Sequence, residues 1–157
     1  MSEPNFFTAN AGLANVDRLG VEELVLLYRI EMAGELFYNM LADRVDDEAA
    51  ADLLRKNAVE ERGHARRLAR AISIKTGTEW EPAPHEATLL DVPLPDTIDA
   101  RIFAAVVQGE INGDVGYQRW ADNETDPEIE RLLRLNGREE TIHAGRAQQV
   151  HDLLAAP

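Results

Sequence analysis

The chain contains no cysteine among its 157 residues. Disulfide bonds, thiolate metal ligands and Cys-x-x-Cys centres are therefore excluded. Aromatic residues are scarce, at 6%, and no cationic start is followed by a long apolar run. We therefore expect neither a signal peptide nor a membrane span, and a cytoplasmic location.

Positive charge is also scarce, because 16 Lys and Arg stand against 29 Asp and Glu, a formal net charge of −13. Such a chain repels polyanions, so we expect no nucleic acid and no anionic membrane as a partner. It attracts cations such as Fe(II). The length fits one domain with one sizeable core. Apolar residues at 45% and charged residues at 29% are ordinary values for a helical domain.

One stretch of the chain occurs twice. Residues 31–67 resemble residues 110–146 without a gap when the sequence is shifted by 79 positions. A repeat of this length indicates one structural unit used twice. The identical pairs include Glu31 and Glu110, Gly34 and Gly113, Tyr38 and Tyr117, Asn57 and Asn136, Glu60 and Glu139, Glu61 and Glu140, and His64 and His143.

Each copy contains a glutamate and, thirty residues later, the pattern Glu-x-x-His. If each copy is a helical hairpin, residues equally far from the turn lie at the same height. The midpoints, Asp46 and Thr125, both fall in turn-like runs. A spacing of three places the Glu and His of each pattern on one helix face. The six side chains that should converge in one layer are Glu31, Glu61, His64, Glu110, Glu140 and His143.

Four buried carboxylates repel one another and lose their hydration, so a layer of this kind requires cations. Two metal ions fit the six side chains, which form the pattern of the di-iron or di-manganese site in ferritin-like bundles. From about residue 20 to 154 the chain resembles the ferritin-like superfamily, in particular the rubrerythrins and bacterioferritins.

This resemblance implies two Fe ions, with Mn as the alternative, bridged by Glu61 and Glu140. Glu31 and Glu110 would each bind one ion, and each histidine would give one nitrogen to one ion. The implied activity is an oxidoreductase that reduces O2 or hydrogen peroxide or oxidises Fe(II), served by an unknown electron donor. The alternative is a non-enzymatic iron-binding or structural protein.

The chain departs from the resembling families at two places. Rubrerythrins carry an additional glutamate three residues after the ligand of the third helix, where this chain has Gly113, and Asp114 is an imperfect substitute. Bacterioferritins have a haem-binding Met directly after the glutamate of the second helix, where this chain has Arg62. We therefore expect no haem, and no carboxylate exchange at residue 113.

The predicted fold is all-α, a ferritin-like four-helix bundle. Two helical hairpins, related by the internal repeat and a pseudo-two-fold axis, are joined by one long crossover. Residues 1–19 lack a helical period and should form a mobile arm or a short cap, followed by the bundle domain, residues 20–157. The expected helices span about 20–45, 47–76, 96–123 and 126–154, and the crossover spans 77–95.

Further side chains are expected close to the metal layer. Tyr38 and Tyr117 lie seven residues after Glu31 and Glu110, and should hydrogen-bond toward the site or fill the core. One turn below the metals, a second polar layer should orient the ligands or form a buried polar network. Its members are Glu35, Asn57, Asp114 and Asn136.

Other charged residues are expected to lie away from the site. Glu60 and Glu139 precede the bridging glutamates by one residue and so should point about 100° away. Their removal should leave the metal content unchanged. His85 and His151 are expected at the surface. Apolar residues off the inward stripes, together with the resemblance, predict a homodimer or a larger oligomer; these residues are Val25, Met32, Ile72 and Trp120.

Overall fold

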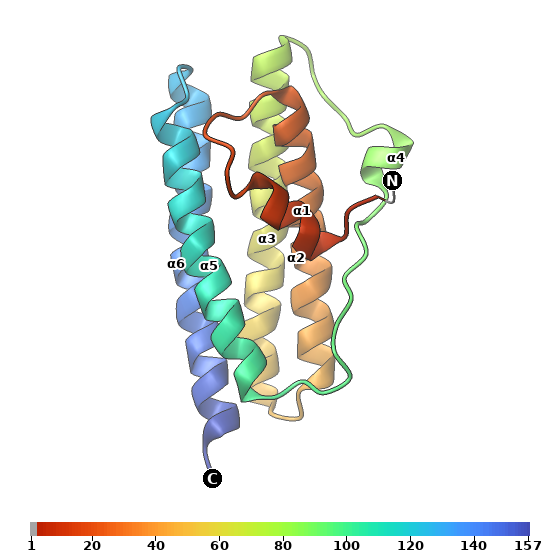
Figure 1. Cartoon of the computed structure of the whole chain (residues 1–157), viewed down its shortest axis with the longest axis vertical. Coiled ribbons are helices and arrows are strands. Elements are labelled where there is room, and N and C mark those ends of the chain that lie inside the picture. Colours follow the sequence, from red (N-terminus) through yellow and green to blue (C-terminus); the bar gives the residue numbers. More distant parts are fainter. Residues whose placement is uncertain (1–2) are drawn as a thin grey trace.

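The computed structural model describes residues 3–157, and within this range it contains helices and no strand. Four long helices form a bundle, as Figure 1 shows, which confirms the predicted all-α ferritin-like fold class. None of the helices in these residues combines the length and the apolar character that a bilayer crossing requires. The helices are α1 (Phe6–Leu13), α2 (Val21–Arg44), α3 (Glu48–Thr76), α4 (Pro84–Ala87), α5 (Ala100–Asp122) and α6 (Pro127–Ala155).

The bundle consists of two antiparallel hairpins, α2 with α3 and α5 with α6 (Figure 1). The segment between α3 and α5 runs from one end of the bundle to the other, as a long crossover does. It contains the short helix α4, which was not predicted. α3 and α6 pack against each other and join the hairpins.

Local sequence sets the ends of the long helices. The Asp47 side chain accepts a hydrogen bond from the Ala50 N–H at 2.8 Å and opens α3. Asp126 does the same for α6 with the Ile129 N–H at 3.0 Å, next to a proline at the first helical position. Gly77, with φ 76°, ends α3 in the left-handed conformation. The two turns therefore lie where the hairpin spacing predicts them.

The third long helix begins later than predicted, at Ala100 instead of residue 96. The Asp99 side chain accepts a hydrogen bond from the Arg101 N–H at 3.0 Å and so fixes the start of α5. Four residues that were expected to be helical therefore belong to the crossover.

The N-terminal segment also differs from its prediction, because it contains the helix α1. Asn5 and Thr8 form a capping box at its start. Ala9 and Leu13 are buried against the bundle, and Phe6 packs on Phe37 of α2 with ring centroids 5.2 Å apart. The prediction of a mobile arm or a short cap did not include this helix, in which eight residues with weak amphipathic character still bury two apolar side chains.

The helices α2 and α5, which face the viewer in Figure 1, do not pack directly on each other. Among residues 3–157, no Cα of α2 lies within 8 Å of a Cα of α5. The segment after α1 crosses to α5, where Arg119 donates to the carbonyl of Ala14 at 2.8 Å and Trp120 donates to that of Val16 at 2.6 Å. α1 and residues 14–17 therefore bridge α2 and α5.

The apolar residues that suggested an oligomer are partly accounted for inside one chain. Ile72 is fully buried and Trp120 is 7% exposed, so neither supports an interface. Val25 and Met32 are half-buried. Oligomerisation stays a prediction that now depends on the resemblance.

Candidate metal centre

The six residues predicted to converge do so, and all are buried. Glu31 comes from α2, Glu61 and His64 from α3, Glu110 from α5, and Glu140 and His143 from α6. The four carboxylates retain 4–8% exposure, whereas both histidines retain none. Each long helix therefore contributes to one cluster of four acids and two imidazoles in the centre of the bundle.

Besides a set of three, His64, Glu140 and His143, the cluster contains two overlapping sets of four whose possible ligand atoms lie within 4.8 Å of one another. One set holds Glu31 and His64, and the other holds Glu110 and His143. Glu61 and Glu140 belong to both sets. Glu61 places Oε2 3.5 Å from Nδ1 of His64 and Oε1 3.3 Å from Nδ1 of His143. This is the arrangement that two ions with two shared carboxylates would need.

Both histidines turn Nδ1 toward the carboxylates. Nδ1 of His64 lies 2.9 Å from Oε1 of Glu140, and Nδ1 of His143 lies 4.0 Å from Oε2 of Glu110. Neither atom has a partner in hydrogen-bond geometry, although both are fully buried. A buried nitrogen without a hydrogen bond, among carboxylate oxygens, suits a metal ligand. The residues present therefore fit a pair of cations.

The other ring nitrogen of each histidine contacts a carboxylate from the opposite hairpin. Nε2 of His64 lies 2.9 Å from Oε2 of Glu139, and Nε2 of His143 lies 3.2 Å from Oε2 of Glu60. A carboxylate only accepts, so these contacts place the ring proton on Nε2 and leave the Nδ1 lone pair for a metal. The prediction that Glu60 and Glu139 point elsewhere is wrong, because it considered one helix and not the facing one.

Two arginines hold these glutamates, and the sequence analysis missed both. Arg67 donates to both oxygens of Glu139 at 2.9 Å. Arg146 donates to both oxygens of Glu60, at 2.5 and 3.2 Å. Their signal was present in the repeat, because Arg67 and Arg146 also differ by 79 positions. Hydrogen bonding to His64 and Arg67 lowers the pKa of Glu139 to about 2, so this group stays an acceptor.

The tyrosines lie where the prediction places them and also cross between hairpins. Tyr38 of α2 donates to Oε1 of Glu110, and Tyr117 of α5 donates to Oε1 of Glu31. Burial and the adjacent carboxylates raise the pKa of both phenols, so both remain protonated donors. Glu31 and Glu110, each of which would bind only one ion and is called a terminal glutamate below, are therefore both oriented by a tyrosine of the other hairpin.

The second polar layer forms only in part. Asn57 and Asn136 are fully buried and donate to the backbone carbonyls of His143 and His64, at 3.2 and 3.3 Å. Glu35 instead pairs with the exposed Arg62, and Asp114 accepts from Thr141 and Gln118. Among the described residues, no hydrogen bond joins either acid to its expected asparagine. The asparagines thus position the histidine backbone, while the acids bond near the surface.

The pKa values of the four carboxyl groups show that the cluster resists ionisation without cations. Burial and the neighbouring Glu31 raise the pKa of Glu61. Burial and Glu61 raise that of Glu140 to about 7, and burial and Glu140 raise that of Glu110. Burial also opposes ionisation of Glu31, but the adjacent Glu61 carboxyl and His64 imidazole lower its pKa to about 2. Metal ions would replace the protons that these groups otherwise hold.

The fold and this cluster agree with the comparison to known families. A family model described as rubrerythrin matches residues 22–151. The chain belongs to the rubrerythrin family. No curated protein and no solved structure matched it. The family match covers all six residues of the centre, so a metal-binding site is expected of this rubrerythrin-family domain.

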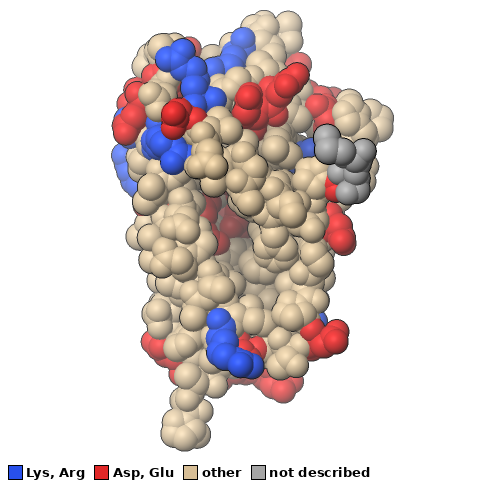
Figure 2. All heavy atoms as spheres, in the orientation of Figure 1, with Lys and Arg blue, Asp and Glu red and all other residues tan. Residues whose placement is uncertain are grey.

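The face of the bundle that carries α1 and α5 is hollowed in its middle (Figure 2). Figure 2 shows acidic atoms at the bottom of a hollow between α5 and α1, on a face whose middle is otherwise free of charged side chains. The slight exposure of the carboxylates, against none for the histidines, agrees with this opening. Small molecules would therefore reach the centre from this face.

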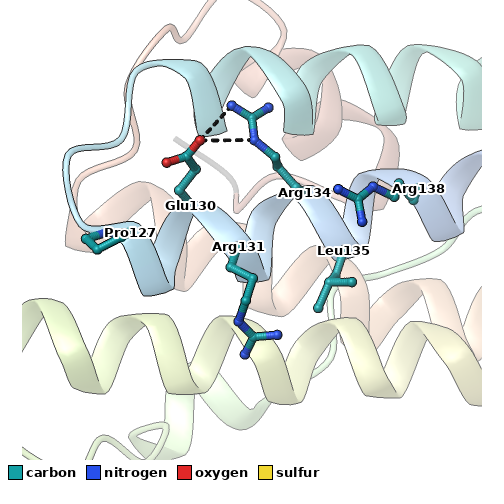
Figure 3. Close-up of a pocket in the computed structure, with 6 residues that line it drawn as sticks. All are labelled: Pro127, Glu130, Arg131, Arg134, Leu135 and Arg138. Atoms are coloured by element: carbon teal, nitrogen blue, oxygen red, sulfur yellow. Dashed lines mark hydrogen bonds and ion pairs between the residues drawn. The ribbon is translucent and has the colours of Figure 1, made fainter.

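A second hollow, of about 240 Å³, lies on the first turns of α6 (Figure 3). Its arginines are largely paired, since Arg134 donates to Glu130 at 2.8 Å and Arg131 donates to Glu128 at 2.7 Å. It contains none of the six central residues. The remaining histidines also lie apart from the centre, because His85 is exposed and His151 contacts Asp152.

Two glycines that correspond in the repeat, Gly34 and Gly113, lie against the centre. A Cβ at Gly113 would lie 3.0 Å from Oε2 of Glu140, and a Cβ at Gly34 would lie 3.2 Å from Cδ of Glu61. Both shared carboxylates therefore pack against a helix surface without side chains. An additional glutamate at residue 113 would require Glu140 to move.

We expect alanine at Gly34 or Gly113 to weaken metal binding without the usual gain in helix stability. Glycine to alanine in a helix normally raises the unfolding free energy by roughly 0.5–1 kcal/mol. Here the new methyl group would displace a shared carboxylate. Thermal unfolding and metal titration of Gly113→Ala measure both effects.

Matched controls exist in the same bundle. A Cβ at Gly63 or Gly109 would meet nothing within 4 Å. Gly63→Ala and Gly109→Ala should therefore raise the unfolding free energy and leave metal binding unchanged. If Gly113→Ala behaved like Gly109→Ala in both measurements, the close contact with Glu140 would have no role in holding metal.

Proposed function

We propose that this protein is a di-iron oxidoreductase that reduces O2 or hydrogen peroxide, oxidises Fe(II), or does both, at a carboxylate-bridged dinuclear centre in the cytoplasm. The observation that carries the proposal is the pair of four-residue sets sharing Glu61 and Glu140. Each set offers three carboxylates and one imidazole, which suit iron or manganese better than copper. Family membership supports the same assignment.

In this proposal Glu61 and Glu140 bridge the two ions. Glu31 and His64 complete one site, and Glu110 and His143 complete the other. When bound, a pair of iron ions would supply two electrons for the reduction of O2 or peroxide. No nucleophilic side chain is required.

The surrounding residues keep the ligands in place during a change of metal charge. Glu139 and Glu60 fix the ring orientation of the two histidines and stabilise positive charge on them. Tyr38 and Tyr117 hold one oxygen of each terminal glutamate and leave the other oxygen free for a metal. The ligand set therefore needs little rearrangement between redox states, which favours repeated turnover.

The charge distribution suits the proposed substrates. The net charge of −13 favours the approach of Fe(II). The uncharged middle of the α1–α5 face leaves the hollow accessible to small neutral molecules such as O2 and hydrogen peroxide (Figure 2). Repeated reduction of either oxidant requires an electron donor, which we propose to be a one-electron carrier.

The proposal is tested by loading the metal-free protein with two equivalents of Fe(II) without oxygen and then adding O2 or H2O2 in separate experiments. We expect Fe(II) to be oxidised faster than in protein-free buffer, with continued oxidation when Fe(II) is supplied in excess. Optical absorption measures the Fe(III) that forms, and an oxygen electrode measures the O2 that is consumed.

The controls separate catalysis from storage or a structural role. Glu61→Ala should oxidise Fe(II) at the buffer rate, because it lacks a shared ligand. One round of oxidation that stops at two Fe per chain, with no further turnover for either oxidant, would contradict the oxidoreductase. That result would support the alternative, a non-enzymatic iron-binding protein.

A further inference from the structure

One of the two tyrosines at the centre touches a tryptophan. The ring centroids of Tyr117 and Trp120 lie 5.4 Å apart with an interplanar angle of 78°. At the other end, the Tyr117 hydroxyl donates to Oε1 of Glu31 and its ring lies 6.4 Å from that of His64. Trp120 reaches toward the surface, is 7% exposed, and donates its Nε1–H to the carbonyl of Val16. The two rings therefore link the ligand layer to the outside of α5.

The matching tyrosine has no such neighbour. Tyr38 makes the equivalent hydrogen bond to Glu110, but the residue that corresponds to Trp120 at a shift of 79 is Leu41. The aromatic ring beside Tyr38 is the phenyl of Phe37, with centroids 5.4 Å apart. Phenylalanine is not oxidised by one electron under biological conditions, whereas tyrosine and tryptophan are. The two halves of the centre thus differ in their connection to the surface.

We propose that Tyr117 and Trp120 form a one-sided electron path between the metal centre and the surface beneath residues 14–17. The inference rests on the proposed redox function of the centre. It goes beyond that function because it assigns the half of the bundle through which electrons enter. The partner that it requires is a one-electron donor, since Tyr117 and Trp120 each exchange single electrons.

Electron transfer between the two rings needs a proton acceptor, and the chain supplies one. Tyr117 can lose an electron only if its phenolic proton also leaves, and Oε1 of Glu31 is positioned to accept that proton. The Trp120 N–H faces a backbone carbonyl, which is a poor base, so an oxidised indole keeps its proton. One electron therefore moves from Tyr117 to oxidised Trp120 as one proton moves from Tyr117 to Glu31.

In the inward direction, Tyr117 first gives one electron to the oxidised centre of the proposed function, while its phenolic proton passes to Oε1 of Glu31. An electron moves from Trp120 to the neutral Tyr117 radical, and the proton returns from Glu31 to the phenol oxygen. A one-electron donor at the surface then reduces the Trp120 radical cation. Every residue is restored, and one electron has passed from the donor toward the centre.

The path is tested by photochemical oxidation of the full chain, both metal-free and after addition of redox-inert Zn(II). Photogenerated tris(bipyridine)ruthenium(III) serves as the one-electron oxidant, in a background with Tyr28→Phe and Trp80→Phe. These changes remove the other Tyr–Trp pair, whose rings lie 5.0 Å apart. We expect a tryptophan radical that decays as a tyrosine radical appears, observed by transient absorption and electron paramagnetic resonance.

Single substitutions then decide the route. Tyr117→Phe should abolish the tyrosine radical and prolong the tryptophan radical, whereas Tyr38→Phe should change neither, although both remove a hydroxyl bonded to a terminal glutamate. Trp120→Phe should abolish formation of the tyrosine radical. A tyrosine radical that survives in Tyr117→Phe or in Trp120→Phe would overturn the path.

This test is independent of the proposed oxidoreductase activity, because neither the metal-free nor the Zn(II) protein turns over iron. Oxidation of Fe(II) by the wild-type protein, together with absence of radical transfer from Trp120 to Tyr117, would overturn the path alone. Radical transfer without iron turnover would overturn the proposed function and leave the coupling of the two rings established.

Discussion

Replacing Glu61 by alanine should remove both metal ions, whereas replacing Glu31 should remove mainly one. Glu61 belongs to both ligand sets, and its two oxygens face different histidines. Glu31 belongs to one set. Metal content after gel filtration, measured by elemental analysis, gives the two stoichiometries directly.

Replacing Glu61 by glutamine should change the unfolding free energy in opposite directions with and without metal. Each ion that binds only the folded state stabilises it by about 2.7 kcal/mol when the free metal is 100 times its dissociation constant. Glu61→Gln, which keeps the side-chain volume, should lose that contribution for both ions. The expected fall in unfolding free energy is therefore about 5 kcal/mol under those conditions.

Without metal, the effect of Glu61→Gln on the unfolding free energy has the opposite sign. A carboxylate whose pKa is raised by folding, as that of Glu61 is, stabilises the folded protein at low pH. That contribution is lost as the pH rises from the unfolded pKa through the folded one. At neutral pH the metal-free Glu61→Gln protein should therefore be at least as stable as the wild type.

Glu128→Ala provides the control, because it removes a carboxylate that pairs with Arg131 on the exposed face of α6. It should leave metal content and the metal-dependent stability unchanged. Retention of both ions by Glu61→Ala would refute the shared-ligand assignment. Equal loss from Glu31→Ala and Glu61→Ala would refute the division into two sets.

The ligand cluster could be predicted because its geometry depends on distances along the chain. Within a hairpin, the turn fixes which residues lie level, so Glu31 and Glu61 could be paired from their distance to Asp46. The spacing in Glu-x-x-His fixes the helix face. Helix caps at Asp47 and Asp126 then placed both turns correctly.

Contacts between the hairpins could not be predicted in this way. Whether Glu139 meets His64 depends on how closely α3 and α6 approach and with what vertical offset, which no spacing within one hairpin determines. The same holds for Tyr117 and Glu31. The sequence predicted that the Tyr117 side chain points toward the metal layer, but not which residue it contacts there. The helix α1 was missed because its stability comes from packing on α2 and not from its own periodicity.

The contacts across hairpins lead to the second large effect. Replacing Glu139 by alanine should weaken binding at the site that contains His64, and replacing Glu60 should weaken the site that contains His143. Loss of a carboxylate that holds a ligating histidine typically lowers metal affinity 10–100-fold, or about 1.4–2.7 kcal/mol. The original expectation, that both variants keep wild-type metal binding, is replaced by this one.

The effect has two parts that can be separated. Without Glu139, the ring proton of His64 loses its acceptor, and Arg67 loses both of the oxygens it holds. Glu139→Gln keeps a neutral acceptor for the ring but cannot hold Arg67 through two charged oxygens, so its affinity should lie between those of wild type and Glu139→Ala. Arg67→Ala leaves the acceptor in place and should cost less than Glu139→Ala.

Anaerobic titration with Fe(II) or Mn(II) resolves the two sites if their affinities separate. In Glu139→Ala one ion should bind as in the wild type and the other 10–100-fold more weakly, because Glu60 still holds His143. In the double variant Glu60→Ala/Glu139→Ala both ions should bind weakly. The exposed carboxylate control, Glu128→Ala, should give the wild-type isotherm. A wild-type isotherm for the double variant would show that the ring orientation of both histidines is set by the carboxylates of the cluster alone.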